Sequence, residues 1–348
     1  MSNRTYTKDE LKAVLAGMGV TDVVAAERYG SGHINDTFKV DTSRGISFIL
    51  QRINTDIFDP DTVMSNITRV TEHIRAKGGQ SLEVVAYAKP WRLYVFITGA
   101  RTVDLITEAS QAYKAANAFA DFQNALADLP APRLADIIPN FHNTVSRLEQ
   151  LDAALKADVK GRAATCRAEL DFVDARREEA ARIVNLMAAG DIPERITHND
   201  TKINNVMLDD VTGEGTCVID LDTTMPGCAL YDFGDMVRTS TANAAEDEKD
   251  LSKVFSRKEY FEQLVRGYLD KAKFLNEAEL ANLAFSGRLI TLTIGIRFLT
   301  DYLAGDTYFH TAYADHNLVR CRTQLKMVKS MEDQAADYEA IVRAVSGK

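Results

Sequence analysis

The pattern of apolar residues changes near residue 97, and this change constrains the fold more than any other feature of the sequence. Before it, short runs with strand-like alternation lie at 23–28, 37–41, 47–51, 84–88 and 92–97, with one helix expected over 62–76. After it, helical spacing dominates over 108–127, 162–188, 257–269, 276–303 and 317–344. We therefore expect an α+β chain of two lobes: a small sheet-rich N-terminal lobe over 1–97 and a larger, mainly helical C-terminal lobe over 98–348.

Three short strands are expected inside the helical half, at 195–197, 205–208 and 216–221. Strands this short, surrounded by helices, often serve to hold loops in place. The loops between them carry the densest polar chemistry in the sequence. The search for a functional site therefore begins there.

The loop after the first of these strands reads Thr197-His-Asn-Asp-Thr-Lys-Ile-Asn-Asn-Val206. It places Lys202 two residues after Asp200, and Asn205 five residues after it. This spacing matches the catalytic loop of kinases, in which a carboxylate orients the acceptor hydroxyl and an amide oxygen binds the metal. Lys202 is placed to neutralise charge on the transferred group. The alternative is a polar turn whose Asp and Asn only satisfy the backbone.

A second acidic signal follows the last of the short strands, in Ile219-Asp-Leu-Asp222. A hairpin through 209–215 would return Asp220 towards Asn205, so that both could hold a metal ion. The alternative is a solvent-exposed acidic end of a strand. The literal triplet Asp232-Phe-Gly234 matches the metal motif of protein kinases, but it follows Pro-Gly and opens a helix. We therefore predict that Asp232 caps that helix or braces the catalytic loop.

A glycine-bearing turn, Tyr29-Gly-Ser-Gly-His-Ile-Asn35, lies between the first two expected strands. Gly30 and Gly32 would let the backbone approach phosphate oxygens, and together with Asn35 they are the expected contacts of this turn to the nucleotide. The alternative is an ordinary hairpin turn. No lysine stands on the next strand, so Arg52, or the amide of Gln51, is the expected contact to the phosphates. Glu72 is a candidate partner for Arg52, although an exposed surface position explains it better.

The chain resembles the aminoglycoside-phosphotransferase-like small-molecule kinases, and within them the bacterial N-acetylhexosamine 1-kinases. The resemblance covers about residues 29–324 and is carried by Tyr29-Gly-x-Gly-His-Ile-Asn35, Ile49-Leu-Gln-Arg-Ile-Asn54, Thr197-His-Asn-Asp-Thr-Lys202, Ile219-Asp-Leu-Asp-Thr223, Met225-Pro-Gly227, Leu230-Tyr-Asp-Phe-Gly-Asp235, Arg297-Phe-Leu-x-Asp-Tyr302 and His316-Asn-Leu-Val-Arg320.

This resemblance implies a bilobal protein-kinase-like fold with ATP between the lobes and Mg²⁺ as the cofactor. Asp200 would be the catalytic base, and Asn205 and Asp220 would hold the metal. His33, Arg297 and Tyr308 would line the site of a sugar acceptor, phosphorylated at its anomeric hydroxyl. Taken from the residues alone, Arg297 lies in an apolar helix where a charge needs a partner, and a pair with Asp301 one turn later explains it equally well.

Two other functions stay open on the sequence alone. The acceptor could be a different small alcohol, such as an amino alcohol, a homoserine-like amino acid or an aminoglycoside. An acidic pocket would suit a cationic acceptor, and residues 246–248 or Asp306 could supply one. The third reading is a catalytically inactive nucleotide-binding regulator, against which the intact Asp200, Asn205 and Asp220 argue.

Composition excludes some partners and locations. A net charge of −9 disfavours broad nucleic-acid binding, which needs a cationic surface. No run of about 18 apolar residues is present, so no membrane association is expected. The four cysteines are scattered without metal-ligand spacing, and the N-terminus is polar. We expect a cytoplasmic protein.

Overall fold

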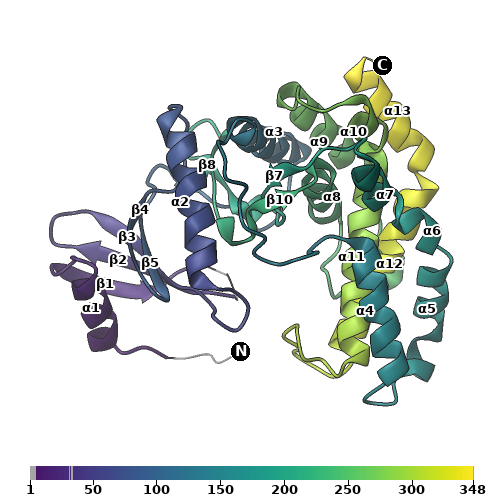
Figure 1. The fold of residues 1–348 in the computed structure, drawn as a ribbon, viewed down its shortest axis with the longest axis horizontal. Helices are drawn as coiled ribbons and strands as arrows, with labels where there is room; N and C mark the ends of the chain where they lie inside the picture. The colour runs from purple at the N-terminus through teal and green to yellow at the C-terminus, as the bar shows by residue number, and fades with distance from the viewer. Residues whose placement is uncertain (1–4, 31, 33, 348) are drawn as a thin grey trace.

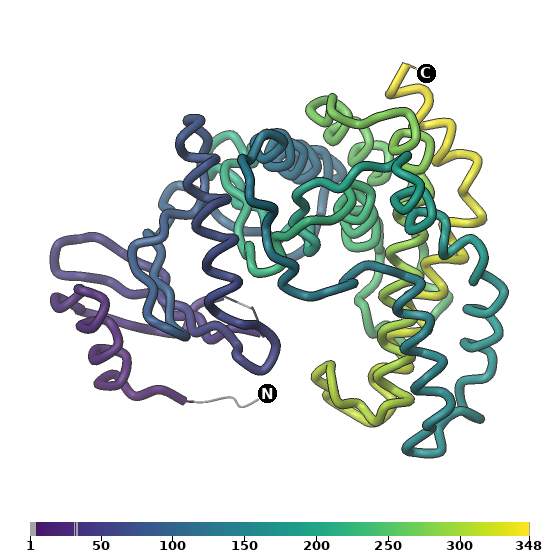
Figure 2. Tube along the Cα trace, in the orientation of Figure 1, coloured from purple at the N-terminus to yellow at the C-terminus, as the bar shows by residue number. Residues whose placement is uncertain are grey.

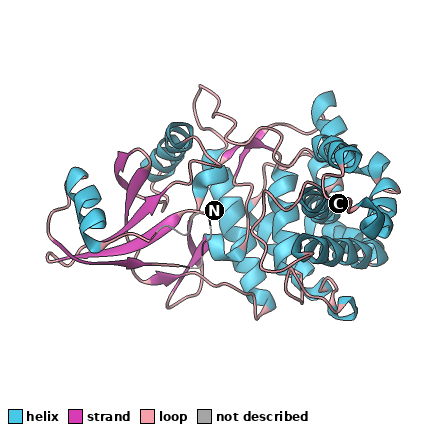
Figure 3. Cartoon of the chain, turned by 90° about the horizontal axis from the view of Figure 1, so that it is seen from below, coloured by secondary structure: helices cyan, strands magenta, loops and turns pink. Residues whose placement is uncertain are grey.

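The computed structural model describes residues 5–30, 32 and 34–347. A sheet-bearing N-terminal region lies at one end of the molecule and a helical C-terminal region at the other (Figures 1 and 3). The expected fold class, an α+β chain with a small antiparallel sheet followed by a helical portion, is confirmed.

The N-terminal sheet is antiparallel throughout, with the strand order β1-β2-β3-β5-β4. Its strands are β1 (Val23–Arg28), β2 (Asp36–Thr42), β3 (Ser47–Arg52), β4 (Val84–Ala88) and β5 (Trp91–Val95). Side chains alternate between its faces. One face buries Phe38, Leu50 and Leu93 against helix α1 (Lys8–Gly17). The other face carries Gln51 and Arg92 and looks towards the helical region.

Helix α2 (Pro60–Ala76) connects the sheet to the rest of the molecule. It begins at a proline whose missing N–H is not needed there, and the Asp59 side chain accepts from Thr62 N. Its apolar face, including Val63, Ile67 and Val70, belongs to the same core as the C-terminal helices. The sheet region is therefore joined to the helical region through a shared apolar core.

The helical region is more broken than the sequence predicts. Its helices are α3 (Ala109–Leu126), α4 (Thr144–Ala157), α5 (Arg167–Asp174), α6 (Arg177–Ala180), α7 (Arg182–Ala189), α8 (Ala229–Ser240), α9 (Lys258–Lys271), α10 (Glu277–Ala281), α11 (Leu283–Leu303), α12 (His316–Asp333) and α13 (Ala335–Ser346). The expected helix over 162–188 is four short pieces, those over 276–303 and 317–344 each divide in two, and α4 was not expected.

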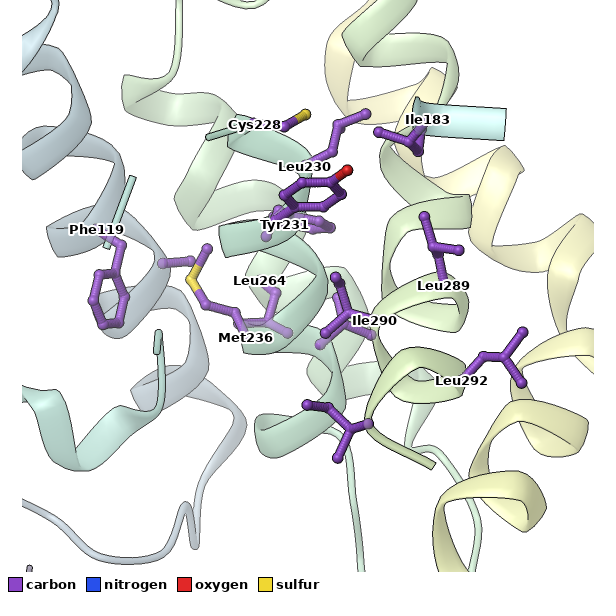
Figure 4. Packing of buried hydrophobic residues seen from close by; sticks show 14 of the residues in the cluster. Phe119, Ile183, Cys228, Leu230, Tyr231, Met236, Leu264, Leu289, Ile290 and Leu292 are labelled. Carbon is purple, nitrogen blue, oxygen red and sulfur yellow. The ribbon is translucent and has the colours of Figure 1, made fainter. Parts of the chain in front are cut away.

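Helix α11 runs through the centre of the helical core. Figure 4 shows Ile290 of α11 on the side that faces α8, the helix of Tyr231 and Met236, whereas Leu292 points away from α8; all four belong to one buried core. At Gly234 and Gly287 an added Cβ would lie 2.5 Å from atoms of the facing helix, so the two helices touch closely. Among the described residues α11 alone is long and apolar enough to span a membrane, yet 78% of its most apolar window is buried. Such burial is typical of the core helix of a globular protein.

Two small sheets lie between the N-terminal sheet and the long helices (Figures 1 and 2). One has the order β6-β8-β9 and the other pairs β10 with β7. Their strands are β6 (Ala100–Arg101), β7 (Arg195–Thr197), β8 (Val206–Asp209), β9 (Gly215–Val218) and β10 (Met225–Gly227). The three strands predicted within the helical half are present, and they carry the loops described next.

Candidate functional site

The side chain of Asp232, in α8, holds the loop after β7 in place through hydrogen bonds. The Asp232 carboxylate accepts hydrogen bonds from His198 N at 2.9 Å, Asn199 N at 2.7 Å and Gln123 Nε2 at 2.7 Å. Burial raises the pKa of Asp232 to about 6, although these donors act to lower it. The predicted role of Asp232 as a brace for the loop is confirmed, and its carboxylate is fully engaged in that role.

Asn199 turns the chain so that Asp200 points away from this buried support. Its backbone is left-handed, with φ at 66°, a conformation that asparagine adopts more readily than most residues. Its side chain donates to Thr223 O at 2.9 Å, and its carbonyl contacts Nε2 of the buried His142 at 2.9 Å. These contacts account for asparagine at the position where protein kinases have arginine.

Asp200, Lys202 and Asn205 lie together on this loop. Lys202 Nζ is 3.1 Å from Asp200 Oδ2, and Asn205 Nδ2 donates to Asp200 O at 2.8 Å and to Oδ2 at 3.2 Å. Burial acts to lower the pKa of Lys202, but the carboxylates of Asp200 and Asp235 raise it. The Asp200 side chain keeps 29% of its surface exposed, so the carboxylate is held in place and still accessible.

The β8–β9 hairpin brings Asp220 to the same place. Ile219 N donates to Asn205 O at 2.9 Å, and Ile219 O contacts Nε2 of His198 at 2.8 Å. Asp220 has a left-handed backbone and is open to solvent, although protein atoms surround it on most sides. Desolvation and the nearby carboxylates of Asp222 and Asp200 raise its pKa to about 7. Because Ile219 bonds to Asn205 and the Asn205 side chain bonds to Asp200, the hairpin brings Asp220 to the loop that carries Asp200, as predicted.

Asn205 and Asp220 together offer oxygen ligands suited to Mg²⁺. Because the Asn205 amide nitrogen is used by Asp200, its Oδ1 remains available, and within the described residues it has no hydrogen-bond partner. The Asp220 carboxylate likewise has no hydrogen bond or ion pair there. Within the same part of the chain, no group of three or more His, Cys, Asp or Glu side chains forms a protein-only metal site. Mg²⁺ in phosphate-handling proteins typically uses one or two protein ligands plus phosphate oxygens and water, so the residues fit this ion.

The glycine-bearing turn lies where the N-terminal sheet approaches the turn that follows Asp220. Gly30 has φ at 79°, and an added Cβ would meet no atom within 4 Å at Gly30 or at Gly32, so both leave the backbone accessible. Asn35 connects the two turns, because its Nδ2 donates to Asp222 Oδ2 at 2.6 Å. His33 lies outside the described residues, so its predicted contact with the acceptor stays a prediction.

The predicted contact between Arg52 and phosphate does not fit the structure. Residues alternate along β3, and Arg52 shares its face with Leu50, where it lines a surface pocket with Tyr6 and Trp91 beneath α1. Its neighbour Gln51, the other candidate, lies on the face that looks towards Asp222. Two cations lie on that face, Lys39 of β2 and Arg92 of β5, and Arg92 is the one that contacts Gln51 and Asp222. No ion pair joins Arg52 to Glu72 in the described part of the chain.

Arg297 and Tyr308 lie together near Asp200. Arg297 Nη2 donates to Tyr308 Oη at 3.3 Å, and the guanidinium lies 4.9 Å from the centre of the Phe141 ring and 5.4 Å from that of Phe309. Burial lowers the pKa of Arg297, and the charge of Asp200 acts in the opposite direction. Phe141 also contacts His142, whose Nε2 contacts Asn199 O, so Arg297 lies on the side of the catalytic loop that these residues cover.

The alternative pairing of Arg297 with Asp301 is wrong. Asp301 is buried and accepts instead from the backbone N–H groups of Thr307 and Tyr308 at 2.8 Å and Phe309 at 2.9 Å. Its fourth donor is Asn317 Nδ2 at 2.8 Å. Asp301 therefore fixes the loop that carries Tyr308. Arg297 has no carboxylate within 4.0 Å among the described residues, which leaves its remaining donors available.

The fold and this set of side chains define the class of protein. The family model described as "Phosphotransferase enzyme family" matches residues 25–275, well over half of the 348 residues. The chain belongs to this phosphotransferase family.

Solved structures with the same fold are similar over nearly the whole chain. A choline/ethanolamine kinase family protein from Mesorhizobium loti is 20% identical with a TM-score of 0.60, covering 97% of this chain and 99% of its own. A microcompartment-associated aminopropanol kinase is 15% identical with a TM-score of 0.60, covering 94% and 98%. An ADP-bound aminoglycoside phosphotransferase is 15% identical with a TM-score of 0.56, covering 93% and 99%. At these identities the similarity establishes the fold.

Proposed function

We propose that this protein transfers the γ-phosphate of ATP to a hydroxyl group of a small molecule, with Mg²⁺ as cofactor. The most direct support is the arrangement of four side chains. Asp200, Lys202 and Asn205 lie together on one loop, and the β8–β9 hairpin brings Asp220 to the same loop. Nucleotide-bound relatives, including an ADP-bound and an ATP-bound aminoglycoside phosphotransferase, support ATP as the donor. The intact set argues against an inactive regulator.

Each side chain has a role that its contacts support. Asp200 accepts the hydrogen bond of the acceptor hydroxyl and takes its proton as the oxygen–phosphorus bond forms and the bond to ADP breaks. Lys202 holds the Asp200 carboxylate and offsets the charge of the transferred group. Asn205 and Asp220 would hold Mg²⁺, whose chemistry here is to neutralise phosphate charge.

We propose further that the acceptor is a sugar, phosphorylated at its anomeric hydroxyl, with an N-acetylhexosamine as the first candidate. Arg297 and Tyr308 offer hydrogen-bond donors beside Asp200, and Phe141 and Phe309 offer flat apolar surfaces, a combination typical of sugar sites. The family resemblance of the sequence motifs supports the same choice.

A cationic acceptor, such as an amino alcohol or aminoglycoside, finds less support in the charges. Three of the four acidic residues that would attract it are already paired, and the fourth, Glu248, accepts a hydrogen bond from Asp250 N at 2.8 Å. Glu246 lies 3.1 Å from Arg238, Asp247 contacts His316 at 3.2 Å, and Asp306 pairs with Arg162. The guanidinium of Arg297 would repel an ammonium group. A neutral acceptor fits this side of Asp200 better.

Phosphorus NMR of the protein with ATP, Mg²⁺ and a panel of acceptors tests the proposal. The panel pairs free sugars with the same sugars blocked at the anomeric position, and includes choline, ethanolamine and an aminoglycoside. A product phosphorus signal split by an anomeric proton, absent with blocked sugars, is the expected result. Phosphorylation of the amino alcohols alone would overturn the sugar assignment. No transfer to any acceptor would refute the proposal that the protein is an enzyme.

The variant Asp200→Asn tests the role of the base. It should lower kcat by roughly 10²–10⁴-fold, the range typical for loss of a positioned general base, with little change in melting temperature. Asp210→Asn, in the exposed turn of the β8–β9 hairpin where Asp210 pairs with Arg101, is the matched control and should keep full activity. Near-normal turnover in Asp200→Asn would refute the assigned mechanism.

A further inference from the structure

A buried ion pair links the N-terminal sheet to the turn that carries Asp220. Arg92 of β5 and Asp222 are 1% and 4% exposed in their side chains, and Arg92 Nη1 lies 2.5 Å from Asp222 Oδ1. Asp222 stands two residues after Asp220, in the 3₁₀ turn Leu221–Thr223. Neither member of the pair is needed for the roles proposed above.

Arg92 is itself fixed by the sheet. Its Nε donates to Gln51 Oε1 at 3.0 Å, and Gln51 Nε2 donates in turn to Thr37 Oγ1 at 3.0 Å. The guanidinium also lies 5.3 Å from the centre of the Tyr94 ring. A row of side chains on three adjacent strands, β2, β3 and β5, therefore ends at Asp222.

The other oxygen of Asp222 is also held from the sheet side. Asn35 donates to Asp222 Oδ2 at 2.6 Å, and its own Oδ1 accepts from Asn54 N at 3.0 Å. Further along the turn, Asn66 of α2 donates to Thr224 O at 3.0 Å. The turn after Asp220 is thus held by three side chains of the N-terminal region.

The same turn is attached to the catalytic loop on its opposite side. Thr223 Oγ1 donates to His198 O at 2.7 Å, and Asn199 Nδ2 donates to Thr223 O. The position of Asp220 therefore depends on both regions at once. Burying an ion pair is costly, and well-packed apolar residues often stabilise a fold as much or more. A buried pair at this place is better explained by its geometry than by its contribution to stability.

We infer that Arg92 is a positioning residue for the metal site: through Asp222 it sets where the Asp220 carboxylate lies relative to Asn205. The inference rests on the proposed Mg²⁺- and ATP-dependent function. Arg92 touches neither the acceptor nor the transferred group in this role. Its loss weakens Mg²⁺-dependent nucleotide binding while leaving the affinity for the acceptor unchanged.

The test compares Arg92→Met, Arg92→Lys and the double variant Arg92→Met/Asp222→Leu with the wild type. Calorimetry measures the Kd of a non-hydrolysable ATP analogue at a series of Mg²⁺ concentrations, and thermal melting measures stability. Arg92→Met leaves Asp222 buried and unpaired, so it should melt lower, and the double variant should recover much of that loss. Both should need roughly 10–100-fold more Mg²⁺ for the same nucleotide affinity, the range typical for loss of an outer-shell support.

Arg176→Met is the matched control, because Arg176, just before α6, and Glu332 of α12 form a partly buried pair at 2.7 Å. It should melt lower with its Mg²⁺ requirement unchanged. Arg92→Lys keeps a charge for Asp222 and should fall between wild type and Arg92→Met.

A folded double variant with the wild-type Mg²⁺ requirement would overturn the inference, as would an equal shift in Arg176→Met. If the wild type itself binds no nucleotide with Mg²⁺, the proposed function fails instead. The two failures are therefore distinguishable in one set of titrations.

Discussion

Removing the Asp301 carboxylate should loosen the loop that carries Tyr308 and so weaken binding of the acceptor. In the structure three consecutive backbone N–H groups of this loop, from Thr307 to Phe309, donate to Asp301 at 2.8–2.9 Å. Asp301→Ala removes the acceptor oxygens of all three N–H groups at once. It also removes one partner of Asn317 Nδ2 in α12, which keeps its contact with Asp306 Oδ1 at 2.9 Å.

The size of the effect follows from these hydrogen bonds. Each contributes about 0.5–1.5 kcal/mol net, because the freed N–H groups can be hydrated in an exposed loop. Three of them amount to about 1.5–4.5 kcal/mol of loop ordering, which the acceptor must then supply on binding. Since about 1.4 kcal/mol corresponds to a factor of ten, the KM for the acceptor should rise roughly 10- to 1000-fold.

Steady-state kinetics with each substrate varied in turn checks this prediction. The KM for ATP should change by less than about twofold, as for a change remote from its site. Asp333→Ala, at the exposed end of α12 where Asp333 pairs with Lys329, is the control and should alter neither constant. An Asp301→Ala protein with an unchanged acceptor KM, or with both constants raised equally, would refute the reasoning.

Two further predictions concern the metal site and pH. Asp220→Asn keeps a residue that tolerates the left-handed backbone at this position but removes the charged ligand, so calorimetry should find Mg²⁺-dependent ATP binding lost; unchanged titrations would contradict the metal assignment. Desolvation lowers the pKa of the buried His142 from 6.5 to about 4. Because the unfolded chain then binds this proton at higher pH than the folded chain, the contribution of His142 is fully present above pH 6.5, and about 3 kcal/mol is lost as the pH falls towards 4. Urea unfolding between pH 7 and pH 4 measures it, and His142→Gln should lose less stability than wild type over that range.

The proposed catalytic set could be predicted from the sequence because its members are close along the chain. Asp200, Lys202 and Asn205 share one loop, and a hairpin of known geometry returns Asp220 to them. The role of Asp232 also followed from local signals, since a Pro-Gly and a helical pattern exclude the kinase metal motif there. Such short-range relations depend on turns and spacing, which a single sequence contains.

The residues on the sheet side could not be predicted in the same way. Arg92 meets Asp222 only because β5 pairs with β3 in a register that places Arg92 opposite Gln51, and no local pattern specifies that register. The face on which Arg52 lies could have been predicted. Phe48 and Leu50, which stand four and two residues before it and share its face, are apolar. The prediction for Arg52 followed the need for a cation at the phosphates, whereas the alternation of side chains along β3 places Arg52 on the opposite face.

The predicted helix boundaries were wrong for a related reason. The expected helix over 276–303 divides at Asn282, whose side chain donates to Ala278 O, and the one over 317–344 divides at Gln334, whose side chain donates to Ser256 O and Ser330 O. Side chains that hydrogen-bond nearby backbone compete with continuous helix, and in the second case the partner is a distant loop. Periodicity alone does not contain that partner.

The central position of α11 has a consequence for how the chain acquires its structure. During synthesis residues 283–303 are complete before α12, the helix that covers one side of them, has been made. For that interval the nascent chain carries a segment with the composition of a membrane span, packed by α4 and α8 but open on the side that α12 covers. A polypeptide ending before His316 would keep that apolar side uncovered, and we expect it to aggregate.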